Sequence, residues 1–408
     1  MEASAEKAAS KGAPKPRLVT PVFLLITLST FVYFVSIGTL LPTLPRFVEG
    51  PLGGGSVSVG LAIGSFALSA VALRPFIGGV GDRRGRRLLM IGGASVVALS
   101  IALYPIATSL VPLLFLRLFT GAGEAAFYVG AASAINDLAP DERRGEALSY
   151  FSLALYSGLA VGPVLGEVLL DGSHFTTVYI VSAAFAGIGA LVGLRVPDTR
   201  PEGFAADADA ERKLIHRSGL MPGTILATSI WGLSGFTTFI PLYALEIGMS
   251  GSKLVFATYS GVVLAIRSLG ARLPDILGPR RAATSALACS TAGLLIIGTW
   301  GEPAGVFMGA AVFGVGQALA FPALMTLAIS GTKPSERGAV VGTFTAFFDL
   351  SFGLGALSLG AVAALLGYRG LFITAAGVSA GGIVLLRFYA RRARVRREIA
   401  EARGPEWV

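Results

Sequence analysis

Twelve long apolar runs of 17 to 28 residues dominate the chain, the first at 18–41 and the last at 370–386. An α-helix rises about 1.5 Å per residue, so about 20 apolar residues cross the ~30 Å hydrocarbon layer of a bilayer. Of the 408 residues, 53% are hydrophobic and only 14% are charged. A water-soluble domain of that composition would expose large apolar patches, so the runs indicate a membrane protein.

Helices explain these runs better than strands do. A closed β-barrel also satisfies every backbone hydrogen bond in lipid, but its strands read as alternating segments of about ten residues. The runs here are continuous and much longer. The sequence therefore predicts an all-α membrane protein with twelve transmembrane helices.

The basic residues predict the orientation of these helices. Of the 33 Lys and Arg residues, 27 lie in the N-terminal arm, in the loops after even-numbered runs or in the C-terminal tail. Loops rich in Lys and Arg stay in the cytoplasm, so both termini are expected to be cytoplasmic. The formal charge of +9 then points to anionic lipid headgroups. RNA binding by the tail is the alternative, which the lack of interleaved aromatic residues disfavours.

A polar interval divides the runs six and six. The predicted divisions are a cytoplasmic arm at 1–17, a first six-helix bundle at 18–196, a cytoplasmic linker at 197–219, a second bundle at 220–390 and a basic cytoplasmic tail at 391–408.

The two halves carry one plan, offset by 193 residues. Arg74 and Asp82 in the first half correspond to Arg267 and Asp275 in the second. The same offset relates these further pairs: Gly85 and Gly278, Gly121 and Gly314, Gly123 and Gly316, Glu124 and Gln317. Repeats in an apolar chain are typical of secondary transporters, and they predict two pseudo-symmetric bundles.

A cluster at the end of the second run resembles the cytoplasmic signature of the major facilitator superfamily, Gly-x-x-x-Asp-Arg-x-Gly-Arg-Arg. Its residues are Gly78, Asp82, Arg83, Gly85, Arg86 and Arg87. The resemblance covers essentially the whole chain and implies that Asp82 caps the start of helix 11 and holds the cytoplasmic side closed. It also implies that Asp137 is the acidic partner of the motif arginines. The alternative is that these charges only anchor the helix ends at the membrane surface.

A second pattern lies in the fifth run, where the residues are Gly158, Gly162, Pro163 and Gly166. It resembles the motif that the superfamily associates with exporters that exchange substrate for a cation. The residues fit the drug:proton antiporter branch, except that Glu167 replaces a usual glycine. The glycines and proline favour a kinked, closely packed helix, and an ordinary structural kink is the alternative.

Ionisable residues inside the runs are candidate functional residues, because an unpaired charge in hydrocarbon is costly. Arg117, Glu124 and Tyr128 share one face of the fourth predicted helix, and Gln317 is the repeat mate of Glu124. Glu124 and Asp349 both fall near mid-membrane by residue count, where a carboxylic acid could exchange a proton near neutral pH. Arg74 and Arg267 lie nearer the runs' cytoplasmic ends and are expected to snorkel to the interface.

These features predict a proton-coupled exporter of a small amphipathic or drug-like compound, working by alternating access. An importer or facilitator of a sugar or organic acid is the alternative, and a non-transporting scaffold is a third. Cys289 is the only cysteine, so no Cys cluster can hold a metal. No cofactor, metal site, catalytic residue or nucleic-acid partner is expected. We expect a monomer in a bacterial plasma membrane, driven by the proton gradient.

Overall fold

The computed structural model describes residues 18–140, 143–170, 174–199, 216–269, 276–330, 332 and 336–402. These residues form eleven α-helices and one short 3-10 helix. The helices are α2 (Pro21–Glu49), α3 (Ser56–Arg84), α4 (Arg86–Ala102), η1 (Tyr104–Ile106), α5 (Leu110–Leu138), α6 (Arg144–Leu169), α7 (Phe175–Gly193), α8 (Arg217–Glu246), α9 (Lys253–Leu269), α11 (Pro279–Thr299), α12 (Pro303–Ile329) and α13 (Arg337–Ala402). Over this part of the chain, ten helices are long and apolar enough to span a membrane.

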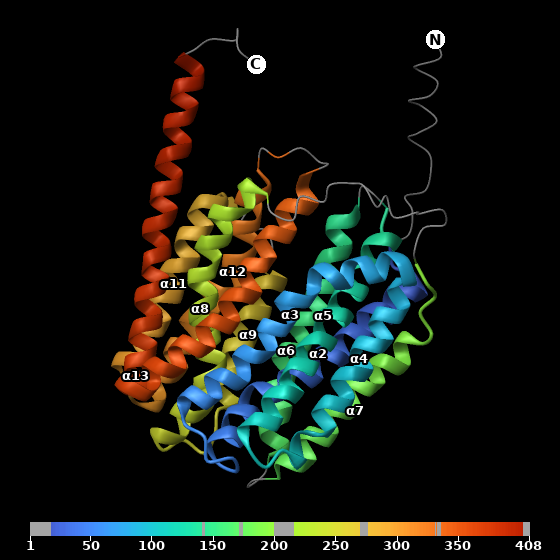
Figure 1. Ribbon diagram of the computed structural model, residues 1–408. Coiled ribbons are helices and arrows are strands. Elements are labelled where there is room, and N and C mark those ends of the chain that lie inside the picture. Colours follow the sequence, from blue (N-terminus) through green and yellow to red (C-terminus); the bar gives the residue numbers. More distant parts are fainter. Residues whose placement is uncertain are drawn as a thin grey trace.

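The last helix bends sharply at Gly367. This residue has φ 69° and ψ 177°, a conformation that costs a residue with a Cβ atom more than it costs glycine. The bend separates the predicted runs 339–366 and 370–386, so α13 consists of two consecutive rods that turn back on one another (Figure 1). Helix α9 has 17 residues and is shorter than the other helices that line the cavity described below.

The helices form two groups that stand side by side (Figure 1). Helices α2 to α7 pack mainly with one another, and so do α8 to α13. Contacts between the groups come chiefly from three helix pairs: α3 with α13, α6 with α9, and α2 with α8.

The repeat seen in the sequence reappears as a repeated helix contact. A methyl group at Gly123 of α5 would lie 2.7 Å from the carbonyl oxygen of Gly93 in α4, and one at Gly316 of α12 would lie 2.6 Å from that of Ala286 in α11. Both pairs obey the 193-residue offset. Small residues let helices approach closely in lipid, where no hydrophobic force drives them together.

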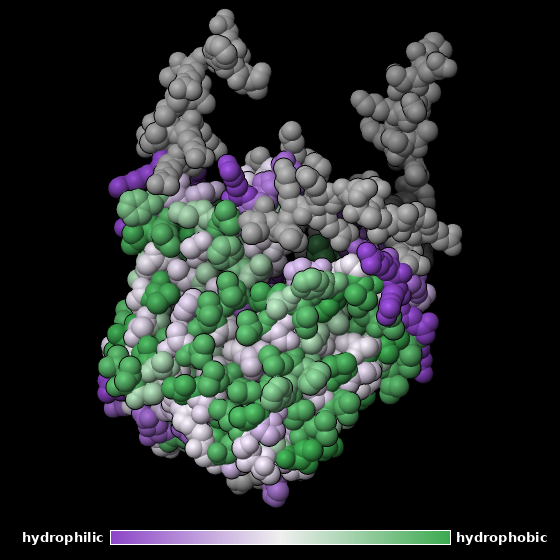
Figure 2. All heavy atoms as spheres, in the orientation of Figure 1, coloured by the Kyte–Doolittle hydropathy of each residue, from purple (hydrophilic) through white to green (hydrophobic). Residues whose placement is uncertain are grey.

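Large apolar side chains cover the lateral surface of the molecule. Leu99, Phe115 and Leu191 are each about 60% exposed, and Leu365 is 83% exposed. On the face drawn in Figure 2, hydrophobic residues cover most of the middle, and the hydrophilic residues gather mainly toward the two ends. This distribution suits a surface surrounded by hydrocarbon.

Among the described residues, the close backbone contacts between the two groups of helices lie toward one end. We call the end with Asp82 and Arg86 the motif end, and the other the Glu167 end. A methyl group at Gly60 of α3 would lie 2.5 Å from the Ala356 carbonyl oxygen in α13, and one at Gly360 would lie 2.6 Å from that of Ser56. Nearer the motif end, methyl groups at Gly78, Gly79 and Gly342 would meet nothing within 4 Å.

Candidate functional site

A cavity of about 220 Å³ lies between the two groups of helices. Both groups line it, mostly with aliphatic and aromatic side chains. Its polar members are Arg74, Arg117, Glu124, Tyr156, Thr237, Tyr259, Ser260, Arg267, Gln317 and Asp349. A largely apolar wall with a few polar groups is typical of small-molecule sites.

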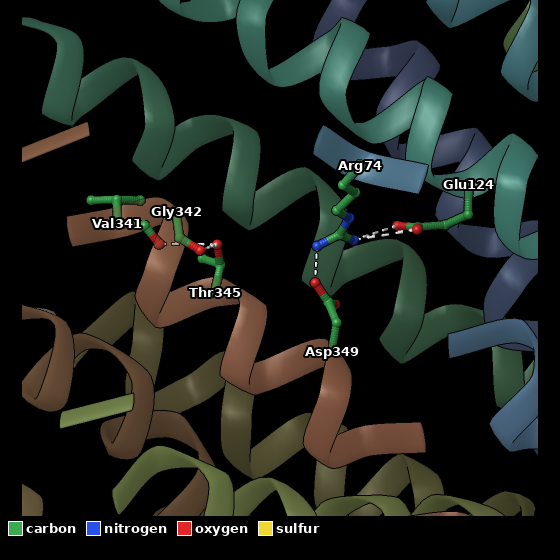
Figure 3. Close-up of polar contacts among 6 residues, drawn as sticks. All are labelled: Arg74, Glu124, Val341, Gly342, Thr345 and Asp349. Carbon is green, nitrogen blue, oxygen red and sulfur yellow. Dashed lines mark hydrogen bonds and ion pairs between the residues drawn. The ribbon is translucent and has the colours of Figure 1, made fainter. Parts of the chain in front are cut away.

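Arg74 of α3 joins two carboxylates that belong to different groups of helices. Its Nη2 lies 3.4 and 3.3 Å from the Oε1 and Oε2 atoms of Glu124 in α5. Its Nη1 donates to Oδ2 of Asp349 in α13. Figure 3 shows the guanidinium between the two acids. The Glu124 side chain is 8% exposed and that of Asp349 is 16% exposed, so the network is a largely buried one.

The expected position of Arg74 is therefore wrong: the side chain turns into the cavity and does not snorkel to the interface. A carboxylate in a low-dielectric site attracts a guanidinium strongly, and each charge offsets the other's desolvation. Its partners lie 50 and 275 residues away. The only sequence signal was the presence of two further ionisable residues within apolar runs.

Arg117 and Tyr128 lie beside this network. Arg117 Nε donates to the Ala62 carbonyl oxygen at 2.9 Å, and Nη1 donates to Tyr104 Oη at 3.3 Å. Arg117 shares the cavity with Glu124, as the helical spacing predicts. Tyr128 instead lies under Arg74, whose Cζ is 4.9 Å from the centroid of the ring.

The residues that the repeat relates to the two acids, Gln317 and Tyr156, are neutral. Gln317 Nε2 donates to Ser229 Oγ at 3.0 Å and to Ser290 Oγ at 3.3 Å. Arg267 of α9 also lines the cavity instead of snorkelling, and its Cζ lies 3.7 Å from the ring centroid of Tyr156 in α6. The 193-residue offset relates Arg267 to Arg74 and also Asp349 to Tyr156. The repeat could have revealed this pair from the sequence.

The signature motif forms an ion network at the motif end. Arg86 Nη1 donates to Asp82 Oδ1 at 2.6 Å, and its Nε donates to Asp137 Oδ2 at 3.2 Å. The structure thus brings Asp137 to a motif arginine, as the resemblance implies, while Arg83 is exposed. Arg87 reaches the Leu194 carbonyl oxygen at 2.6 Å.

Asp198, which sequence reasoning placed in the linker, also belongs to this network. Its Oδ1 accepts from the Arg86 backbone N–H at 3.1 Å, at the start of α4, where a carboxylate is stabilised by the helix dipole. Gly85 and its repeat mate Gly278 both have positive φ, 97° and 76°. Asp275 lies outside the described residues.

The glycines of the α6 pattern face α2 within the first group of helices. A methyl group at Gly158 would lie 2.6 Å from the Phe31 carbonyl oxygen, and one at Gly162 would lie 2.5 Å from the Gly38 Cα. A methyl group at Gly166 would likewise lie 2.5 Å from the Thr39 carbonyl oxygen. Pro163 lies against Gly38. The pattern therefore sets how closely α6 and α2 approach.

Glu167, the departure from that pattern, joins the two groups of helices. It accepts from Arg46 Nη1 at 3.1 Å, and from the backbone N–H and the Oγ of Ser252 at 3.1 and 2.5 Å. Its side chain is only 4% exposed. Tyr368 makes a second such link by donating to Glu49 Oε1 at 3.0 Å. From the sequence, Glu167 is a weak candidate because it lies near the outer end of its apolar run, and its partner Ser252 lies 85 residues away.

Comparison with known proteins agrees with this architecture. The family model described as Major Facilitator Superfamily matches residues 26–332 and 253–407. The chain belongs to the major facilitator superfamily. Its repeated halves and its motif at 78–87 are those of a member of this family.

Relatives extend over nearly the full length of this superfamily member. An MFS-type transporter of Burkholderia pseudomallei (strain 1106a) is 29% identical, covering 96% of this chain and 98% of the relative. One of Pseudomonas aeruginosa (strain LESB58) is 31% identical, covering 92% and 95%. Among solved structures, a bacterial homologue of the human lysosomal transporter Spinster, in an inward-facing and occupied conformation, has a TM-score of 0.76 at 14% identity, covering 91% and 96%. The protein is thus a multi-pass membrane transporter of the superfamily type.

Proposed function

We propose that the protein is a proton-coupled exporter that exchanges a small amphipathic compound for protons by alternating access. The observation that carries the proposal is the Arg74 network, in which one arginine holds Glu124 of its own helix group and Asp349 of the other. In this proposal α9 and the two rods of α13 complete twelve spans, and both termini are cytoplasmic in a bacterial plasma membrane.

The network supports coupling because a proton changes its charge balance. With both acids ionised, Arg74 links α3 to α13 across the cavity. Protonation of Asp349 removes the negative charge of that link, so that Arg74 is then paired with the charge of Glu124 only. Proton occupancy therefore alters the free energy that holds the two groups of helices together, which is what a coupled alternating-access cycle requires.

The position of the network suits this role. Along the α3 and α13 pair, tight contacts at Gly60 and Gly360 lie toward the Glu167 end, and Arg74 lies beyond them beside the cavity. The same network would favour coupled import equally well. Export is favoured by the α6 pattern, whose residues resemble the antiporter motif.

The test is efflux of two fluorescent dyes, cationic ethidium and anionic fluorescein, from cells that express the protein. We expect gradient-dependent efflux of at least one dye, falling to background with a protonophore and in Asp349→Asn or Glu124→Gln. Glu302→Gln, at an exposed carboxylate outside the cavity, is the matched control and should behave like wild type. Efflux that persists at the wild-type rate after the proton gradient is collapsed would refute proton coupling.

A further inference from the structure

A second arginine of the cavity, Arg267, has no acidic partner among the described residues. Arg267 occupies the position related to Arg74 by the repeat. Where Arg74 meets Asp349 and Glu124, the related positions hold Tyr156 and Gln317, which are neutral. Among the described residues no carboxylate lies within ion-pair distance of Arg267, and its Nε is buried without a hydrogen-bond partner.

The other two arginines of the cavity are engaged. Arg74 also has a buried Nε without a partner, but both of its terminal nitrogens contact carboxylates. Arg117 donates to Ala62 and Tyr104. Three arginines and two carboxylates line the cavity, so its charged side chains sum to +1 when both acids are ionised. Among the described residues neither Arg117 nor Arg267 contacts a carboxylate, but Arg117 has hydrogen-bond acceptors in Ala62 and Tyr104, so Arg267 is the arginine of the cavity with neither a charged nor a hydrogen-bonded partner.

An unpaired guanidinium beside a low-dielectric cavity is costly unless a ligand supplies the counter-charge. The ring of Tyr156 offers partial compensation by a cation–π contact and fixes the guanidinium plane. This contact leaves the nitrogens at the edge of the guanidinium available, in the geometry that binds a carboxylate through two hydrogen bonds.

We propose that Arg267 binds a carboxylate group of the transported compound. This inference rests on the proposed function in placing the substrate in this cavity. If transport exchanges substrate for protons, a cationic group on the compound would compete directly with the protons of Glu124 and Asp349. A zwitterionic amphipathic compound meets both conditions, and the apolar cavity wall accommodates its hydrocarbon part.

The experiment uses two matched probes, 2-amino-4-phenylbutyrate and its amide 2-amino-4-phenylbutanamide, which differ only in the carboxylate. Binding to the purified full-length protein is measured by calorimetry at fixed pH. We expect Arg267→Gln to weaken binding of the acid by at least about tenfold and to leave the amide unchanged, because only the acid loses a buried ion pair. Arg267→Lys should retain part of the affinity for the acid.

A second variant tests the charge without removing Arg267. Tyr156→Asp places at the repeat-related position the acid that Arg74 has in Asp349, and it should also weaken binding of the acid by about tenfold or more. Equal effects on acid and amide, no effect in either variant, or no binding of the acid to wild type at millimolar concentration would each overturn the inference. Dye efflux with and without the gradient is measured separately, so failure of proton coupling is distinguishable from failure of carboxylate binding.

Discussion

At the scale of single residues, the stability of the charged network in the cavity depends on charge compensation. Arg74 is stable in its buried position because Glu124 and Asp349 supply two negative charges. Removing one member of a buried ion network leaves the others uncompensated, and this is more costly than removing opposite charges together. Stability is therefore expected to depend on which charges are removed, more than on how many.

Arg74→Gln should lower the free energy of unfolding by roughly 3–5 kcal/mol, since two acids then face each other without a cation. The double variant Arg74→Gln with Asp349→Asn should recover a large part of this loss, because one negative charge is removed as well. Thermal unfolding of the purified protein in detergent measures both. Strictly additive losses in the double variant would contradict the charge argument.

At the scale of helices, close packing depends on glycine. The sequence predicted apolar helices and a special role for the α6 pattern, but it could not show which neighbour the glycines face. That depends on the rotation of α6 against α2, which the contacts of Gly158, Gly162 and Gly166 reveal. Similarly, the repeat predicted equivalent halves, and the structure shows the same close helix contact in each half, between α4 and α5 and between α11 and α12.

Gly162→Ala should destabilise the protein by about 1–3 kcal/mol, because the new methyl group has no space against Gly38 and α2 must move. Gly187→Ala in α7 is the matched control, since a methyl group there meets nothing within 4 Å. The shift in thermal unfolding temperature compares the two. An unfolding temperature as high in Gly162→Ala as in the control would show that the helix pair has room to adjust.

At the scale of the whole molecule, the two groups of helices are joined at the Glu167 end. Glu167 contacts Ser252, and Tyr368 contacts Glu49. In each pair, one residue belongs to the first group of helices and the other to the second. Alternating access requires these links to break when that end opens. These links are three hydrogen bonds to two carboxylates, few enough to break, whereas an extensive apolar seal would resist opening.

A reversible cross-link at this end tests the motion. In a Cys289→Ser background, Glu167→Cys together with Ser252→Cys should react with a short bifunctional methanethiosulfonate, and dye efflux should fall to background. Reduction should restore it, and either single cysteine variant should remain active after the same treatment. Full transport by the cross-linked protein would mean that this end does not open during the cycle.

The sequence by itself determined the membrane class, the helical spans, the repeated halves and the buried acids Glu124 and Asp349, because hydropathy, periodicity and repeat spacing are local properties of the chain. The tertiary structure alone decided that Arg74 bridges those acids and that Glu167 joins the two groups. Such partners lie up to 275 residues apart. Which side chains meet across an interface depends on the rotation and approach of whole helices, and no local pattern encodes these.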